Sequence, residues 1–229
     1  MRCGLFGKLP SKRDFIAVGA AREFLGVWER WIQGGISASR MRLGEGWQEA
    51  FLKAPIWRFW LGAEVSGAAV IGAFMPSVDG VGRYFPLTVF ARAEEGGAIP
   101  PPEFDAQEAW FVQAEQLLLS ALEPEATFEA VSASLATLAP PSDRLQGPPP
   151  DGMIRLPEGS LVATADPAAL PELLAAVRVE DHARAYAAST FWWTIGGEGY
   201  RPLVVVGRRM PDPYLFTGML TGSFDHVFQ

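Results

Sequence analysis

The amino-acid sequence predicts an α+β fold in which an antiparallel or mixed central sheet is covered by helices. Short apolar runs with strand-like alternation come in neighbouring pairs, at 70–74 with 84–91 and at 190–195 with 203–206. Stretches with helical spacing are grouped between those pairs. This order argues against a doubly wound parallel sheet, in which strands and helices alternate.

The composition is that of a folded globular protein. The chain has 229 residues, of which 49% are hydrophobic and 20% charged, so one large domain or two small ones are possible. A net charge of -7 argues against nucleic acid as a partner, because phosphate binding needs a basic surface. The sequence leaves the oligomeric state open.

The first part of the chain predicts a strand followed by two helices. Residues 2–7 form the strand, which Pro10 closes. Apolar residues three or four apart then predict a helix, which Gly34-Gly35 weakens near its end: Phe24, Val27, Trp28, Trp31 and Ile32. A second short helix covers 47–52, and Ala54-Pro55 ends it.

A three-stranded antiparallel meander is predicted over 56–91. Its first strand, 56–61, carries bulky side chains on both faces, so both faces are expected to be covered. Arg58 lies on one of these faces and must then be at an edge or paired.

The second half predicts two helices, a break, and a further set of strands and helices. The helices cover 104–122 and 128–138, and a proline-rich loop follows at 139–152. A strand at 160–165, a helix that Asp166-Pro167 begins and a 190–206 hairpin come next. Asp212-Pro213 begins a last helix.

The loop between the second and third meander strands is the most specialised segment. It reads Met75-Pro-Ser-Val-Asp-Gly-Val-Gly-Arg-Tyr-Phe-Pro-Leu-Thr88. Turn residues of this kind predict an ordered loop that presents Asp79 and Arg83. The two side chains either pin the loop to each other or bind a partner, and their spacing alone favours the first interpretation.

Motifs for catalysis and for cofactor binding are absent from the sequence. Gly4-Leu-Phe-Gly-Lys8 lacks the spacing of a phosphate-binding loop. The single Cys3 excludes an internal disulfide and a cysteine zinc site, and His182 and His226 lack metal-ligand spacing. We therefore expect no catalytic residue, no metal and no cofactor. No apolar run is long enough to span a bilayer and no signal peptide is visible, so we expect a cytoplasmic protein.

Several motifs resemble those of one family. They are Gly7-Lys-Leu-Pro10 with Asp14-Phe15, Trp28 to Arg40 with Leu43-Gly44 and Trp47, Pro55-Ile-Trp-Arg-Phe59, and Met75 to Leu87. Together they are similar to the TagF (ImpM) family of type VI secretion system accessory proteins. The segments Ser189 to Thr194 and Met210 to Phe216 look like the C-terminal half of that family.

The resemblance implies a regulator and not an enzyme. Proteins of this family hold back assembly or firing of the secretion system after translation, by engaging a forkhead-associated scaffold protein. The implied fold is a three-layer α/β/α sandwich similar to longin domains. A single domain over 1–229 is expected, without the appended phosphatase domain that some members carry.

Six residues are the candidate site on this hypothesis. Asp79, Gly82 and Arg83 are expected to frame the loop, with Lys8 and Arg58 on the same surface. The structural interpretation instead joins Asp79, Arg83 and Asp14 in an ion-pair network. An alternative function is a sensor or enzyme that responds to a small molecule or nucleotide, with Lys8, Arg58, Asp79 and Arg83 around a pocket.

Overall fold

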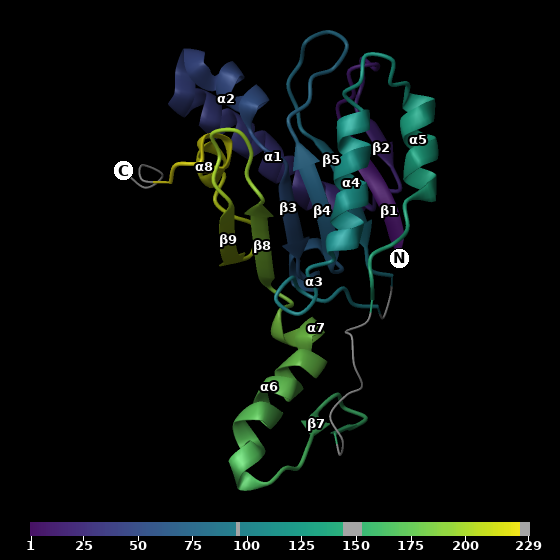
Figure 1. The fold of residues 1–229 in the computed structure, drawn as a ribbon, viewed down its shortest axis with the longest axis vertical. Helices are drawn as coiled ribbons and strands as arrows, with labels where there is room; N and C mark the ends of the chain where they lie inside the picture. Colours follow the sequence, from purple (N-terminus) through teal and green to yellow (C-terminus); the bar gives the residue numbers. More distant parts are fainter. Residues whose placement is uncertain (95–96, 144–152, 225–229) are drawn as a thin grey trace.

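A seven-stranded antiparallel sheet lies between two layers of helices (Figure 1). The computed structural model describes residues 1–94, 97–143 and 153–224. The strand order is β2-β1-β5-β4-β3-β8-β9, and every neighbouring pair is antiparallel. The α+β prediction and its sandwich form are confirmed, and the sheet proves wholly antiparallel.

The elements follow one another in this order: β1 Arg2–Gly7, β2 Ile16–Val18, α1 Arg22–Leu43, a 3-10 turn Gly44–Gly46, α2 Trp47–Lys53, β3 Trp57–Leu61, α3 Ala63–Ser66, β4 Val70–Met75, β5 Leu87–Arg92, α4 Glu108–Ser120, α5 Phe128–Thr137, β6 Ile154–Arg155, β7 Leu161–Val162, a 3-10 turn Pro167–Ala169, α6 Leu170–Glu180, α7 His182–Ala185, β8 Ser189–Thr194, β9 Leu203–Arg208 and α8 Leu215–Thr221. Strands β6 and β7 form a separate two-stranded sheet. None of the helices in these ranges is long and apolar enough to cross a membrane.

Strand alternation divides the core into two clusters. In β3, Trp57 and Phe59 face the aromatic cluster under α1, α2 and α8, whereas Trp60 faces the cluster under α4 and α5. The Trp28 indole crosses from α1 to the sheet, since its Nε1 donates to Thr88 Oγ1 of β5 at 3.1 Å. Both faces of β3 are therefore covered, as the bulky pattern of 56–61 predicts, and the meander β3-β4-β5 is confirmed.

Helix α1 continues through Gly34-Gly35 to Leu43, so the prediction that it weakens and ends there is wrong. Glycine at this position serves packing between helices. A Cβ added to Gly35 would lie 2.7 Å from Cγ of Phe216, a residue of α8. The close approach of α8 to α1 thus requires glycine at 35. Glycine weakens a helix, but here the packing of Phe216 against α1 offsets that cost.

Gly35, which is packed against Phe216, and Gly26, which is not packed, lie in the same helix and should respond in opposite ways to substitution by alanine. Gly35→Ala should lower the free energy of unfolding by about 1–3 kcal/mol, because overpacking displaces Phe216. Gly26→Ala should raise it by about 0.5–1 kcal/mol, because a Cβ there meets nothing within 4 Å and alanine favours the helix. Urea unfolding of both variants measures the difference, and a stabilised Gly35→Ala would contradict the packing account.

Other boundaries depart from the prediction for local reasons. Helix α4 begins at Glu108 instead of 104, because Gln107 has a φ of 51° and its N–H donates to Asp105 Oδ1 at 2.9 Å. The predicted strand 160–165 shortens to Leu161–Val162. Of the predicted loop 139–152, residues 144–152 lie outside the described residues.

Helix α6 forms where predicted, but its apolar stripe is not covered. No residue of α6 is buried, and Leu174 is 62% exposed. Asp166 does not act as the expected side-chain cap, and a 3-10 turn separates it from the helix. The helix extends away from the sheet with β7 beside it (Figure 1).

Candidate functional site

The loop between β4 and β5 is organised around the Asp79 carboxylate. Its Oδ1 accepts the backbone N–H of Val81 at 3.0 Å and that of Arg83 at 2.9 Å. The backbone N–H of Asp79 donates to the Arg83 carbonyl, and that of Gly82 to the Asp79 carbonyl, both at 3.0 Å. Gly82 has a φ of 84°, a conformation that glycine adopts readily. One carboxylate thus closes the tight turn that Gly82 makes possible.

Two cations share the second oxygen of the same carboxylate. Lys8 donates from Nζ to Asp79 Oδ2, and Arg83 donates from Nε to it at 2.7 Å. The Asp79 side chain is fully buried, whereas that of Arg83 is 57% exposed. Lys8 is also buried, with its Nζ 4.4 Å from the centre of the Phe15 ring. Asp79 and Lys8 therefore form a buried ion pair, and Arg83 extends it to the surface.

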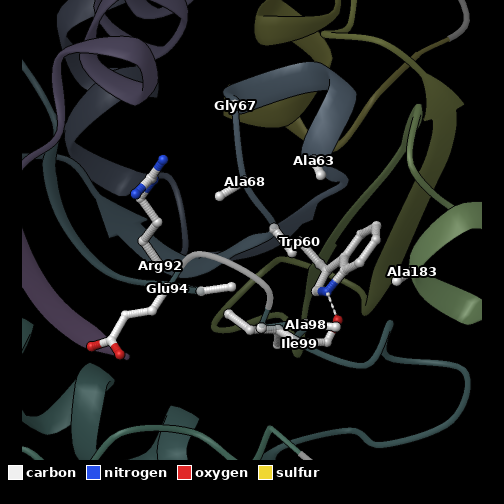
Figure 2. Close-up of a pocket in the computed structure, with 12 residues that line it drawn as sticks. Trp60, Ala63, Gly67, Ala68, Arg92, Glu94, Ala98, Ile99 and Ala183 are labelled. Atoms are coloured by element: carbon white, nitrogen blue, oxygen red, sulfur yellow. Dashed lines mark hydrogen bonds between the residues drawn. The ribbon is translucent and has the colours of Figure 1, made fainter.

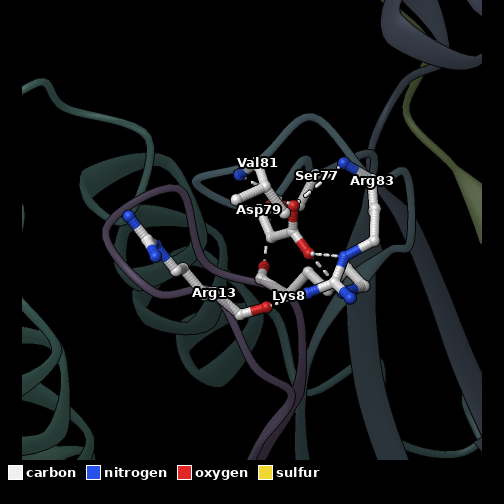
Figure 3. A network of polar contacts seen from close by, with 6 residues as sticks. All are labelled: Lys8, Arg13, Ser77, Asp79, Val81 and Arg83. Carbon is white, nitrogen blue, oxygen red and sulfur yellow. Dashed lines mark hydrogen bonds and ion pairs between the residues drawn. The ribbon is translucent and has the colours of Figure 1, made fainter.

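Backbone carbonyls of residues 8–13 complete this network (Figure 3). Ser77 Oγ donates to the Lys8 carbonyl at 2.8 Å, and the Gly80 N–H donates to the Lys12 carbonyl at 2.9 Å. A guanidinium N–H of Arg83 donates to the Arg13 carbonyl. The segment after β1 and the β4-β5 loop are therefore held together as one unit, although about 70 residues separate them in sequence.

The environment of Asp79 lowers its pKa. Burial alone would raise the pKa of the carboxyl group, but the hydrogen bonds from Lys8, Arg83 and Val81 outweigh it and hold the pKa well below its usual range. A carboxylate of this kind stays ionised at neutral pH, so it is unsuited to accept or release a proton there.

The lowered pKa predicts acid sensitivity. A carboxylate whose pKa is lower in the folded than in the unfolded state stabilises the fold fully above the unfolded value of about 3.9, and less as the pH falls toward the folded value. Asp79→Asn removes this titration. Between about pH 7 and about pH 3, the wild-type protein should lose more free energy of unfolding than the variant does. Urea unfolding at both pH values measures the two losses, and equal losses would contradict this assignment.

Arg58 belongs to a different cluster from Lys8. Its Nε donates to Glu115 at 2.5 Å and its terminal nitrogens donate to Glu108 at 2.6 and 3.0 Å, both on α4. Its guanidinium carbon lies 4.7 Å from the centre of the Phe111 ring. Burial would lower the pKa of Arg58, but Glu115 and Glu108 outweigh it and raise the pKa. From the sequence, Arg58 is expected to lie at an edge or to be paired, and it is paired. Its ion pairs tie β3 to α4.

The six candidate residues are therefore only partly brought together. Lys8, Asp79, Gly82 and Arg83 form one unit, whereas Arg58 pairs with Glu108 and Glu115, and the burial of both Lys8 and Arg58 does not fit the expected common surface. Asp14 is exposed and makes no ion pair with the described residues, which leaves it outside the expected ion-pair network. Of Lys8, Arg58, Asp79 and Arg83, only Arg83 lines a cleft described below, so the expected pocket around all four is not seen among the described residues.

A cleft of about 630 Å³ opens beside the exposed side of Arg83. Its lining comes from the β4-β5 loop and from the segment around the end of α1 and the start of α2: Arg40, Gly44, Glu45, Trp47, Gln48, Gly82, Arg83 and Tyr84. The Arg40 guanidinium carbon lies 4.2 Å from the centre of the Trp47 ring, and Arg40 makes no ion pair with the described residues. The cleft thus presents two arginines and the partly exposed Tyr84 to solvent, and the buried Trp47, whose ring centre lies 5.4 Å from that of Tyr84, forms its floor. We call this region the loop cleft.

A second cavity, of about 390 Å³, lies at the opposite end of β4 and is lined mainly by small residues (Figure 2). Trp60 borders it and donates from Nε1 to the Ile99 carbonyl at 3.1 Å, and Arg92 and Glu94 lie at another side. It holds none of the six candidate residues. Its small-residue lining offers few directed polar groups for a ligand.

Reactive side chains elsewhere are few. Burial raises the pKa of the Cys3 thiol, which keeps it protonated and weakly nucleophilic. Within the described ranges no three His, Cys, Asp or Glu side chains gather as metal ligands.

Most residues of the loop cleft lie within the motifs noted in the sequence, but the sequence does not predict their meeting in one cleft. Arg40 and Tyr84 meet at the loop cleft because α1 is longer than predicted and carries Arg40 to the β4-β5 loop. The acceptors from Lys8, Lys12 and Arg13 are main-chain carbonyls, which any residue type supplies. Side-chain motifs cannot predict contacts of that kind.

Comparisons with known proteins match both halves of the chain. The family model described as the TagF N-terminal domain, type VI secretion system-associated, matches residues 4–138. The crystal structure of PA0076 from Pseudomonas aeruginosa PAO1 is 34% identical, with a TM-score of 0.77, and the match covers 97% of this chain and 96% of that one. No curated protein matches the chain. The family match includes the β4-β5 loop and the segment that closes on it, and the structural match extends through the C-terminal half.

Proposed function

Because the chain belongs to the TagF family of type VI secretion system-associated proteins, we propose that it is a cytoplasmic accessory protein that represses the secretion system after translation. It does so by binding a forkhead-associated scaffold component and not by catalysis. The whole chain, 1–229, acts as a single TagF-like domain. The observation that carries the proposal is the β4-β5 loop, where buried charges fix a shape and leave two arginines at an open cleft.

The state of the buried charges supports binding over catalysis. A general acid or base works best with a pKa near the operating pH. The pKa of Asp79 is instead lowered, which moves it further from neutral pH. Lys8 and Asp79 are buried and satisfy each other, so neither reaches a substrate. Their role is to hold the loop in one conformation, and a pre-ordered loop binds with a smaller entropy cost.

The loop cleft supplies the groups that a protein partner would contact. Arginine and tyrosine are enriched among residues that dominate binding energy, and Arg40, Arg83 and Tyr84 line this cleft. Arg83 keeps guanidinium N–H groups for a partner beyond those used by Asp79 and the Arg13 carbonyl. Carboxylates of the partner are the complementary groups.

The test is capture of secretion-system components by the tagged protein from cells that express the apparatus. We expect the forkhead-associated scaffold among the captured proteins, and we expect deletion of the gene to increase effector release. If no secretion component is captured and release is unchanged after deletion, the proposal fails.

A small-molecule sensor is a second candidate, because the loop cleft has the volume of a ligand site. A ligand that binds only the folded state raises the melting temperature. A thermal-shift screen of nucleotides and small anions should then give a hit that Arg40→Ala abolishes. A screen without such a hit removes this candidate and leaves the scaffold proposal standing.

A further inference from the structure

Strand β9 is the outer strand of the sheet on the side away from β1. Within the described ranges, nothing pairs with its free edge, and no residue of β9 is buried. Strands β4, β3 and β8 lie between it and β5, so this edge is separate from the loop cleft. Figure 1 shows β9 at the margin of the sheet, next to β8.

The two faces of β9 differ. Leu203 and Val205 pack against the aromatic cluster under α1 and α8, whereas Val204 and Val206 are 66% and 58% exposed. Ile195, just beyond β8, is also exposed at 63%. The uncovered side of this edge is therefore apolar, which is unusual for a strand in contact with water.

Alternate residues of β9 direct their backbone groups away from β8. Arg209 N–H donates to the Ala188 carbonyl at 2.8 Å, which places Arg209 in the set that faces β8. The register continues without a break from Ser189 opposite Arg208 to Thr194 opposite Leu203. In an antiparallel ladder the facing residues alternate, so Val204, Val206 and Arg208 present free N–H and C=O groups outward.

Natural edge strands usually carry features that block further pairing, such as lysine, proline or a bulge. The sequence of β9, Leu-Val-Val-Val-Gly-Arg, has no lysine and no proline, and its register has no bulge. The strand thus keeps five residues of regular, uncharged edge, Leu203 to Gly207, between Pro202 and Arg208.

The charges around this edge are basic. Arg201 precedes the strand, Arg208 ends it and Arg209 follows it. All three side chains are exposed, and none makes an ion pair with the described residues. Glu198 and Asp212, each three residues beyond these arginines, are the nearest acids in sequence on the two sides. The edge is therefore suited to a partner with acidic groups at both ends of an extended segment.

A second copy of this chain does not meet that requirement. In symmetric antiparallel pairing centred on Val204, Val205 or Val206, Arg208 would lie opposite Tyr200, Pro202 or Val204, in that order. None of these residues is acidic. The net charge of -7 on each copy also opposes self-association.

We propose that β9 is a docking edge for an extended, acidic segment of another protein, which adds to the sheet as an eighth strand. Backbone hydrogen bonds to Val204, Val206 and Arg208 give the affinity, and the arginines select acidic flanks. Apolar side chains at alternate positions of the segment cover Val204 and Val206. This inference stands apart from the regulatory function proposed above.

The probe is the synthetic peptide acetyl-Asp-Glu-Val-Thr-Val-Thr-Val-Glu-Asp-amide, titrated into the full chain and followed by NMR. Saturable binding is expected, with new protection from hydrogen exchange at the amides of Val204 and Val206. The amides of Leu203 and Val205 change less, because β8 already protects them. A control peptide with lysine in place of every acid should bind at least about tenfold more weakly.

Two sets of variants separate edge pairing from nonspecific contact. Val206→Pro removes one outward N–H and should weaken binding at least about tenfold, whereas the matched Val206→Thr keeps that donor and should change it by less than about threefold. The double variant Arg201→Glu, Arg208→Glu should reverse the preference toward the lysine peptide.

Three results would overturn the proposal. The first is no saturable binding, or equal binding of both peptides by the wild-type chain. The second is binding of the acidic peptide that Val206→Pro leaves unchanged. The third is a dimer in sedimentation that Val206→Pro abolishes, since the occupant would then be a second copy.

Discussion

Replacing Lys8 by methionine is expected to lower the free energy of unfolding by about 3–5 kcal/mol. Removal of one partner of a buried ion pair leaves the other charge desolvated and uncompensated. Here the remaining charge is the Asp79 carboxylate, whose side chain is fully buried. Arg83 still contacts it, but from the exposed side. Urea unfolding at neutral pH measures the loss.

Lys12→Met is the matched control, since Lys12 lies on the same segment with its side chain 42% exposed, 3.7 Å from Glu129 and 4.9 Å from the centre of the Phe128 ring. Its effect should stay within about 1 kcal/mol, as for other exposed ion pairs and cation–π contacts. The double variant Lys8→Met, Asp79→Asn should cost less than the sum of the two single variants. If Lys8→Met and Lys12→Met had equal effects, the buried pair would not be what holds the loop.

Arg40→Glu is expected to weaken capture of the scaffold by at least about tenfold. Like charges brought together in an interface cost several kcal/mol, and the change would place a carboxylate where the partner's carboxylates are expected. Stability should fall by no more than about 1 kcal/mol, because the exposed Arg40 lies over the Trp47 ring and a cation–π pair at the surface contributes no more than that. Quantitative pull-down at matched protein concentrations measures the change.

Arg30→Glu is the control for this variant, because Arg30 is an exposed arginine of the same helix that does not line the loop cleft. It should leave capture unchanged within about twofold. Equal losses from Arg30→Glu and Arg40→Glu would show a general charge effect, and no loss from Arg40→Glu would remove the loop cleft from the interface.

The sequence predicts the sheet better than it predicts the site. Alternation along 56–61 predicts that Trp57 and Trp60 lie on opposite faces, and the two core clusters agree. The same reasoning separates Trp192 from Trp193, of which the first is fully buried and the second only partly. These are properties of one strand with period two, so a local pattern is sufficient.

Contacts between distant segments limit the prediction elsewhere. Glycine at 35 predicts a weakened helix when α1 is considered alone, whereas Phe216 of α8 packs closely against it. Asp79 and Arg83 are four residues apart and pair as expected, but the partner that buries Asp79 is Lys8, 71 residues away. The sequence motifs lead us to expect Arg58 on the same surface as Lys8. In the structure, the partners of Arg58 are instead Glu108 and Glu115 of α4. Tertiary packing decides each of these cases.

Effector release from cells that lack the gene is the measurement that tests the repressor proposal most directly. Cells complemented with the wild-type chain, with Arg30→Glu or with Arg40→Glu are compared at equal protein levels. Deletion should increase release, and the wild-type chain and Arg30→Glu should restore repression, whereas Arg40→Glu should not. Unchanged release after deletion, or full repression by Arg40→Glu, would contradict repression through the loop cleft.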